Sequence, residues 1–142
     1  MSANPDHVAL HAFLGGAVPG PMTTSPLLEA LGASLVSWEN GRLEMGFAPQ
    51  PLFFQGAGFV QGGAMAAMLD FVMAFAGMAA AGAEHTVTTT TMTTSFLAGA
   101  TGARFRAVGE VEKAGRRVIH VRGRLECDGR AVASAGSTLL VI

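Results

Sequence analysis

One segment of this sequence, from about Val60 to Ala81, is apolar on almost every side of the helix that it predicts. Ala, Met, Leu and Phe dominate it, Pro is absent, and Asp70 is its only charged residue. A helix on the surface of a domain carries a polar stripe, whereas a helix without one is surrounded by other parts of the protein. In a chain of 142 residues, only a sheet curled around the helix can provide that cover.

The rest of the chain supplies the strands of such a sheet. Apolar residues alternate on both sides of Asn40-Gly41, which is the strongest two-residue signal for a hairpin, so two strands precede the helix. Four antiparallel strands follow it, with turns at Ala114-Gly115 and Asp128-Gly129. We therefore expect an α+β fold in which a long central helix is wrapped by a curled antiparallel sheet of about six strands. The strands after the helix are predicted at 85–96, 104–113, 117–127 and the end of the chain.

No repeat or linker divides the chain, and its length is that of one domain. We expect residues 1–25 to form an N-terminal helix and loop, and residues 26–142 to form a single domain. The short N-terminal helix is predicted over 7–14, with Asn4 or Asp6 as its cap.

Charge, cysteine content and histidine spacing limit the classes of function. The net charge of −1 argues against a general binder of nucleic acid or of membrane surfaces. The single cysteine, Cys127, excludes an internal disulfide and any multi-cysteine zinc site. The four histidines show no metal-ligand spacing, so we expect neither a metal nor a cofactor. The N-terminal segment lacks the pattern of a signal peptide, and we expect a cytoplasmic protein.

Asp70 stands alone in the apolar helix, with no other charged residue between Glu44 and Glu84. Burying an unpaired carboxylate costs several kcal/mol, so this one has to be partnered, protonated or at a wet cleft. One interpretation is a general base or nucleophile in a site of low polarity. The alternative is a helix residue that reaches solvent at an edge of the sheet.

Gly62 and Gly63 lie at the predicted start of the same helix. Free amide groups and the positive end of the helix dipole can hold an oxyanion there, although the glycines could equally serve only to pack the helix on the sheet. Eight residues separate Gly62 from Asp70, which is about 12 Å at roughly 1.5 Å per residue. Catalytic contacts are about 3 Å long, so if both act on one carbonyl, the second comes from another subunit. Otherwise only one of them acts.

Two further groups of polar residues are candidates for substrate binding. Lys113, Arg116 and Arg117 flank a predicted turn, where they could meet phosphates or simply form a solvated hairpin tip. A row of hydroxyl side chains on one face of the strand after the helix could position water or substrate, although threonine is also an ordinary strand residue. The row comprises Thr89, Thr91, Thr93 and Ser95.

The segment from Gln55 to Asp70, QGAGFVQGGAMAAMLD, is similar to the characteristic motif of hotdog-fold acyl-CoA thioesterases of the phenylacetate-degradation (PaaI) type. That motif has Asn or Gln, then His six residues later, then Gly-Gly, and an acidic residue nine after the His. Gln55, the pair Gly62-Gly63 and Asp70 match it, whereas Gln61 stands at the position of the His. The resemblance spans about residues 26–142.

The resemblance implies a hotdog fold and a site shared between two subunits of a dimer or tetramer. It implies that Asp70 activates water or attacks the thioester carbonyl. The amide of Gly62, helped by the side chain of Gln55, would polarise that carbonyl from the other subunit. Thr89 lies roughly where relatives carry Ser or Thr. Gln61 can form hydrogen bonds but cannot titrate near neutral pH as a His would.

The function implied is hydrolysis of acyl-CoA thioesters, aryl or phenylacetyl types included, to free acid and CoA. The absence of the motif His leaves a non-catalytic acyl-CoA or acyl-carrier binding protein as an alternative. A hydratase or dehydratase fits less well, because those enzymes usually need a His with the acid and residues 55–70 contain none. Acyl specificity should depend on the packing of Phe54, Phe59, Met73 and Phe75.

Overall fold

The computed structural model describes residues 4–142; residues 1–3 of the predicted N-terminal segment lie outside the described residues. Three α-helices, one 3₁₀ helix and seven strands make up the described part of the chain. In chain order they are α1 (Pro5–Leu14), β1 (Gly20–Pro21), α2 (Pro26–Ala30), β2 (Ser34–Glu39), β3 (Arg42–Phe47), η1 (Pro51–Phe53), α3 (Gly62–Ala81), β4 (Val87–Phe96), β5 (Phe105–Ala114), β6 (Val118–Cys127) and β7 (Arg130–Val141).

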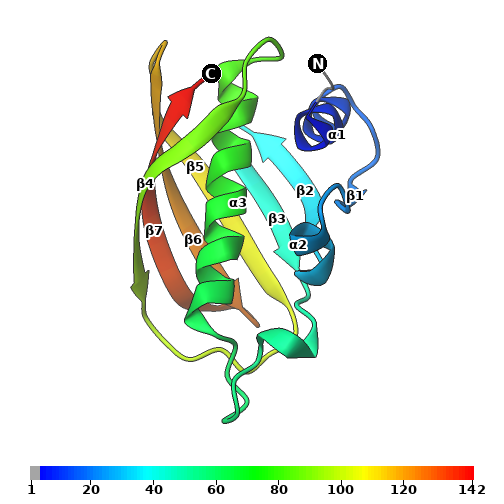
Figure 1. Cartoon of the computed structure of the whole chain (residues 1–142), viewed down its shortest axis with the longest axis vertical. Helices are drawn as coiled ribbons and strands as arrows, with labels where there is room; N and C mark the ends of the chain where they lie inside the picture. Colours follow the sequence, from blue (N-terminus) through cyan, green and yellow to red (C-terminus); the bar gives the residue numbers. More distant parts are fainter. Residues whose placement is uncertain (1–3) are drawn as a thin grey trace.

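The seven strands form one antiparallel sheet in the order β1-β2-β3-β5-β6-β7-β4. The sheet curls around α3, which runs along its concave side (Figure 1). The predicted α+β hotdog fold is therefore confirmed. The additional strand is β1, in which Gly20 and Pro21 pair with Leu35 and Ser34. Two residues are too few to show an alternating pattern, so the sequence predicts six strands rather than seven.

Two of the three predicted turns, at Asn40-Gly41 and Asp128-Gly129, have the backbone conformation that their residues favour. Asn40 and Gly41 both have positive φ, 52° and 74°, and Asp128 and Gly129 have φ of 52° and 80°. Positive φ at both central residues defines the two-residue turn whose twist matches that of the flanking strands. These turns fix the registers of β2 with β3 and of β6 with β7.

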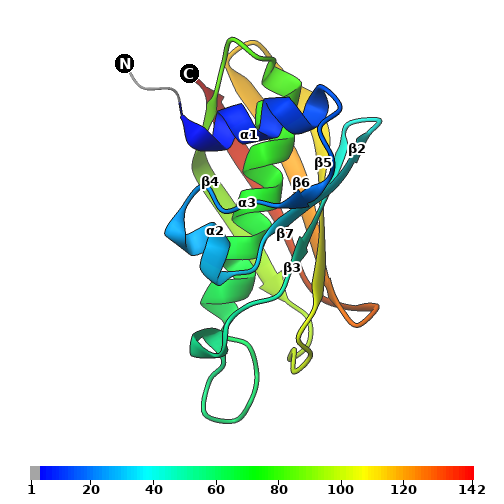
Figure 2. The same ribbon diagram turned by 90° about the vertical axis from the view of Figure 1, so that its right-hand side faces the viewer.

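At the N-terminus, α1 packs against α3 and buries Leu10 completely (Figure 2). Its cap is Asn4, whose side chain accepts a hydrogen bond from the Asp6 amide at 2.9 Å. The helix begins at Pro5, two residues before the predicted start, because Pro is favoured in the first turn, where its missing N–H costs nothing.

By length and composition alone, α3 could cross a membrane, and it is the one such helix in residues 4–142. However, 56% of its most apolar stretch is buried inside the protein, against β3, β4, β5, β6 and β7. A core helix of a globular domain has the same length and composition. The sheet is therefore the cover that the apolar sequence of α3 requires.

Glycines let the helix and the sheet approach closely. A Cβ atom at Gly109 of β5 would lie 2.6 Å from the carbonyl oxygen of Val72 in α3. On the helix, a Cβ atom at Gly77 would overlap the side chain of Leu139 in β7. A larger residue at Gly109 would force the two layers apart, because the clash is with backbone, whereas one at Gly77 would require the Leu139 side chain to move.

We expect Gly109→Ala to lower the free energy of unfolding by roughly 1–3 kcal/mol, because the added methyl group meets the backbone of α3. Urea denaturation followed by circular dichroism measures the change. Gly136→Ala in β7 is the matched control, since no described atom lies within 4 Å of a Cβ placed there. The control should be unchanged or slightly more stable. Equal destabilisation by both variants would contradict the close packing of α3 on β5.

Candidate active site

Asp70 lies near the middle of α3, half-buried, with its side chain directed at β4. Its Oδ1 atom accepts a hydrogen bond of 2.8 Å from the hydroxyl of Thr89. Of the three situations that the sequence allowed for this carboxylate, the structure shows a partnered one. The bond holds the acid against the edge of the sheet and leaves its second oxygen available to other groups.

A β-bulge in β4 places Thr89 on the side of the helix. The register of β4 against β7 shifts between Thr89 and Thr91, so Thr90 is an extra residue in the strand. Before the bulge, Thr89 faces α3, and after it Met92 does. The predicted row of hydroxyls is therefore wrong: Thr93 and Ser95 face away from α3, beside Arg122 and Arg124. A bulge reverses the alternation, and no sequence pattern marks it.

The start of α3 presents free amide groups. Gln61 is the N-cap residue, but its exposed side chain makes no capping hydrogen bond. Its carbonyl accepts from the amides of Ala64 and Met65, at 3.0 and 3.2 Å. Within residues 4–142, no backbone carbonyl accepts from the amides of Gly62 and Gly63. These two N–H groups at the positive end of the helix are suited to an anion or a polarised carbonyl oxygen.

Gln55 and Gly62 meet at one hollow of about 480 Å³ beside the start of α3. Most of its lining is apolar, with the amide side chain of Gln55 and the helix terminus as polar groups, as is typical of small-molecule sites. Several lining residues are not predicted from the sequence, because they come from the far end of β4 and the segment after it, Phe96 and Leu97 among them. The lining includes Gln55, Phe59, Val60, Gly62, Met65 and Phe96.

A tight loop before α3 positions Gln55. The Gln55 amide donates to the Phe59 carbonyl at 2.8 Å, and the Gly58 amide donates back to Gln55 at 2.9 Å. Gly58 has a φ of 86°, which permits this close turn. The Val60 amide then donates to Ala100 at 2.8 Å, which ties the loop to the chain that follows β4. Gln55 is thus held next to the helix terminus.

Asp70 is not among the residues that line this hollow. Both Asp70 and Gly62 belong to the continuous helix α3, so their eight-residue separation keeps them about 12 Å apart in one chain. Gln61 and Gly63 are exposed near the hollow but do not line it either. The structure therefore brings Gln55 to Gly62 and Thr89 to Asp70, in two separate groups.

The basic residues predicted to bind phosphates lie at the opposite end of the molecule. Lys113, Arg116 and Arg117 are exposed at the tip between β5 and β6, near the C-terminal end of α3, whereas Gly62 begins that helix at the other end (Figure 1). The Arg117 carbonyl accepts from the Val141 amide at 2.8 Å, which ties the tip to β7. In one chain these cations are not part of the hollow.

Of the four residues expected to set the acyl pocket, only Phe59 lines the hollow. Met73 and Phe75 are buried in the core, and Phe54 is half-buried in an isolated bridge with Val60. All four are large apolar residues, and the sequence does not show which of them face the sheet and which face solvent.

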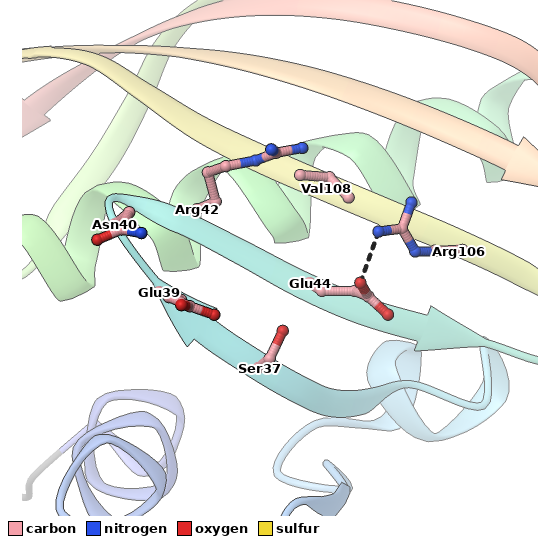
Figure 3. A pocket seen from close by; sticks show the side chains of 7 residues that line it. All are labelled: Ser37, Glu39, Asn40, Arg42, Glu44, Arg106 and Val108. Carbon is pink, nitrogen blue, oxygen red and sulfur yellow. Dashed lines mark ion pairs between the residues drawn. The ribbon is translucent and has the colours of Figure 1, made fainter.

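A second, polar hollow of about 240 Å³ lies on the outer face of β2, β3 and β5 (Figure 3). Glu44 and Arg106 form an ion pair of 2.7 Å there, and the hydrogen bond that Arg106 donates to the Glu44 carboxylate raises the pKa of Arg106. These side chains alternate with buried ones such as Met45 and Ala107, so the sheet separates them from Asp70. This hollow cannot share in chemistry at the helix.

Other routes to catalysis find no support among the described residues. Cys127 is buried, and burial raises the pKa of its thiol, so it is not an activated nucleophile. No group of three or more His, Cys, Asp or Glu side chains in residues 4–142 is placed to hold a metal ion. The half-buried carboxylate and the helix terminus remain as the reactive groups.

Comparison with known proteins assigns the chain to a family. The sequence profile of the thioesterase superfamily matches residues 57–134, which is more than half of the chain and includes Gly62, Asp70 and Thr89. The chain belongs to the thioesterase superfamily. No protein of curated function matches it.

Solved structures of thioesterases resemble this one along nearly the whole chain. A phenylacetic acid degradation-related protein from Ralstonia eutropha JMP134, assigned as a thioesterase, is 31% identical with a TM-score of 0.81, over 92% of this chain and 98% of that one. A thioesterase family protein from Silicibacter pomeroyi is 26% identical with a TM-score of 0.80, over 99% and 98%. A Haemophilus influenzae thioesterase, 17% identical with a TM-score of 0.76 over 81% of each chain, shares the fold. The resemblance to hotdog thioesterases is confirmed, and the chemistry of this thioesterase is thioester hydrolysis.

Proposed function

We propose that this thioesterase hydrolyses acyl-CoA thioesters to the free acid and CoA, at a site that two copies of the chain build together. Asp70 of one copy and the amides and Gln55 of the other would act on one carbonyl. The observation that carries the proposal is the position of these groups at the two ends of β4. Thr89 holds Asp70 near one end, and Phe96 touches Gly62 at the other.

The free edge of β4 favours pairing with a second copy. Among the described strands, β4 pairs only with β7, so its other edge presents unpaired backbone groups. Its sequence, VTTTTMTTSF, contains neither a charged residue nor Pro. Exposed sheet edges are usually protected by such residues, and an unprotected edge is a template for another strand. A second β4, antiparallel to the first, satisfies these groups.

The bulge at Thr90 makes one register of that pairing consistent. Residues directly opposite each other in an antiparallel pair point to the same face of the sheet. A two-fold axis at Thr93 places Thr93 opposite its own copy and Thr94 opposite Met92. Because Thr90 is an extra residue that is skipped in the pairing, Phe96 comes to lie opposite Thr89 of the partner. Both of these side chains face the helices. Asp70 of one copy thereby comes close to the partner's Gly62. These two groups can then act on one carbonyl, although Asp70 and Gly62 of the same chain are about 12 Å apart.

This arrangement supports a simple mechanism. The thioester carbonyl would lie at the helix terminus, where the Gly62 amide and the Gln55 side chain stabilise the oxyanion that forms. The Asp70 carboxylate, oriented by Thr89, either takes a proton from the attacking water or attacks the carbonyl itself. Collapse of the tetrahedral intermediate breaks the carbon–sulfur bond, and the CoA thiolate leaves and takes up a proton. In the general-base route that proton is the one Asp70 took from water, and the product is the free acid. In the nucleophilic route the acyl group stays on Asp70 as an anhydride, which a water molecule then hydrolyses to the free acid and the carboxylate. Gln61 lies outside the hollow, so its replacement of a His leaves these groups in place.

The nucleotide of CoA adds several negative charges that this site does not neutralise. In the antiparallel pair, the C-terminal end of one α3 lies at the same end of the dimer as the start of the other. The exposed Lys113, Arg116 and Arg117 of the partner would then flank the site at which the carbonyl binds. Arginine pairs well with phosphate, which supports a role for this tip in binding the nucleotide.

Replacement of Asp70 by Asn tests the proposed chemistry. We expect kcat for acyl-CoA to fall by roughly 10²–10⁴-fold, because the amide can neither accept a proton nor attack the carbonyl. Release of free thiol from a panel that includes phenylacetyl-CoA measures the loss, and calorimetry measures binding. Glu84→Gln, which removes an exposed carboxylate beyond α3, is the control. Hydrolysis by Asp70→Asn at the parent rate would refute the assignment, and tight binding without any thiol release by the parent would identify a non-catalytic binder.

Thr93→Lys tests the shared site. Two lysines would lie opposite each other across the proposed axis, and like charges there destabilise strand pairing. We expect a folded monomer by light scattering and circular dichroism, with activity reduced at least tenfold. Ser37→Lys places the same charge on the exposed face of β2 and should keep the parent's mass and rate. A fully active monomer would exclude a site made by two chains.

The double substitution of Arg116 and Arg117 by Ala tests nucleotide binding. We expect KM for an acyl-CoA to rise at least fivefold, because phosphate contacts are lost, with kcat largely unchanged. The thioester of N-acetylcysteamine with the same acyl group lacks the nucleotide, so its KM should not change. Arg130→Ala, at the exposed hairpin between β6 and β7, is the control. An equal rise in KM for both substrates would rule out a contact to the nucleotide.

A further inference from the structure

The side chain of Phe96 covers the start of α3. A Cβ atom built on Gly62 would lie 3.3 to 3.7 Å from the Cζ, Cε1 and Cε2 atoms of Phe96, so the edge of the phenyl ring rests on this glycine. The ring is 53% exposed and is part of the lining of the hollow. It is held by the end of β4. A phenyl ring thus stands beside the glycine whose amide is proposed to hold the carbonyl oxygen.

A second aromatic ring also lines the hollow. Phe59, 40% exposed, rests on Gly99, where an added Cβ atom would lie 2.6 Å from two atoms of its ring. Met65 and Val60 are also part of the lining and are almost completely buried. The two rings pack on different segments, since Phe96 adjoins Gly62 of α3 and Phe59 adjoins Gly99 after β4.

The position of Phe96 decides which part of the substrate it contacts. If the carbonyl oxygen accepts from the Gly62 amide at hydrogen-bond distance, the carbon next to the carbonyl lies within van der Waals reach of a ring that touches the same residue. Atoms farther along the acyl chain would lie against the rest of the apolar lining, which includes Met65 and Phe59. A substituent on the first carbon therefore meets Phe96, whereas extra length does not.

We propose that Phe96 is a specificity-determining residue, which selects acyl groups that are unbranched at the carbon next to the carbonyl. The inference rests on the proposed function, because it takes Gly62 as the donor to the carbonyl. Its substrate class is narrower: thioesters of acids with a CH₂ group beside the carbonyl are accepted, and those with a branched carbon there are rejected. A hydrophobic pocket discriminates by roughly 10–200-fold for one misplaced methylene group, so the preference is measurable.

The experiment compares two substrates with the same number of carbon atoms, butanoyl-CoA and 2-methylpropanoyl-CoA. We expect the parent to prefer butanoyl-CoA, and Phe96→Ala to reduce the ratio of the two kcat/KM values at least tenfold. Phe96→Trp, with a larger ring, should raise that ratio. The ratio does not depend on the fraction of active enzyme, so a partial loss of folding or of dimer cannot produce these opposite shifts.

Two controls separate the possible outcomes. Phe59→Ala should change the preference for hexanoyl-CoA over butanoyl-CoA and leave the ratio for branching unchanged, and exposed Leu52→Ala should change neither. An unchanged branching ratio in Phe96→Ala, with the parent active, would overturn the role of Phe96 and leave the proposed function intact. If the parent, folded and dimeric, hydrolysed neither these thioesters nor phenylacetyl-CoA, the proposed function itself would fail.

Discussion

The structure depends on the need to cover α3, an apolar helix of 20 residues with one carboxylate. Burial of its Met, Leu, Val and Phe side chains supplies the main driving force, since such a side chain contributes roughly 1.5–3 kcal/mol when fully buried. The sheet meets this need by curling, and glycines such as Gly109 let it approach the helix backbone. The same curl sets β4 along the flank of α3, so that the two ends of one strand lie beside the two polar features of one helix. The fold and the site thus have a common origin.

Much of this fold can be predicted from particular residues. The apolar run of α3 predicts a wrapped helix, and Asn40-Gly41 and Asp128-Gly129 predict turns whose backbone angles the structure bears out. Other elements of the fold cannot be predicted from the local sequence pattern, because contacts between distant segments determine them. The two-residue strand β1 exists because Leu35 and Ser34 lie beside it, and its Pro21 is an unfavourable strand residue.

The candidate site likewise contains residues that the sequence predicts and residues that it does not. Gly62 and Asp70 are predicted from spacing and chemistry, because a lone acid and a glycine pair in an apolar helix are unusual, whereas Gln55 is predicted only from the resemblance to the thioesterase motif. Phe96 is missed because its importance comes from folding back over Gly62, which lies 34 positions earlier in the numbering. Residue type alone also fails for Met73 and Phe75: they are as apolar as Phe59, yet they belong to the core. Which side of an element a residue faces is decided by tertiary packing.

The bulge at Thr90 is a single extra residue with effects on both sides of it. Removing it would rotate every upstream side chain of β4 to the other face, so Val87 would leave the core and Thr89 would point into solvent. Asp70 would then lose its hydroxyl partner although no residue in contact with it had been replaced. The number of residues in an edge strand thereby decides whether Asp70 keeps its hydrogen-bond partner. Insertions and deletions in this segment should be less tolerated than substitutions of its threonines.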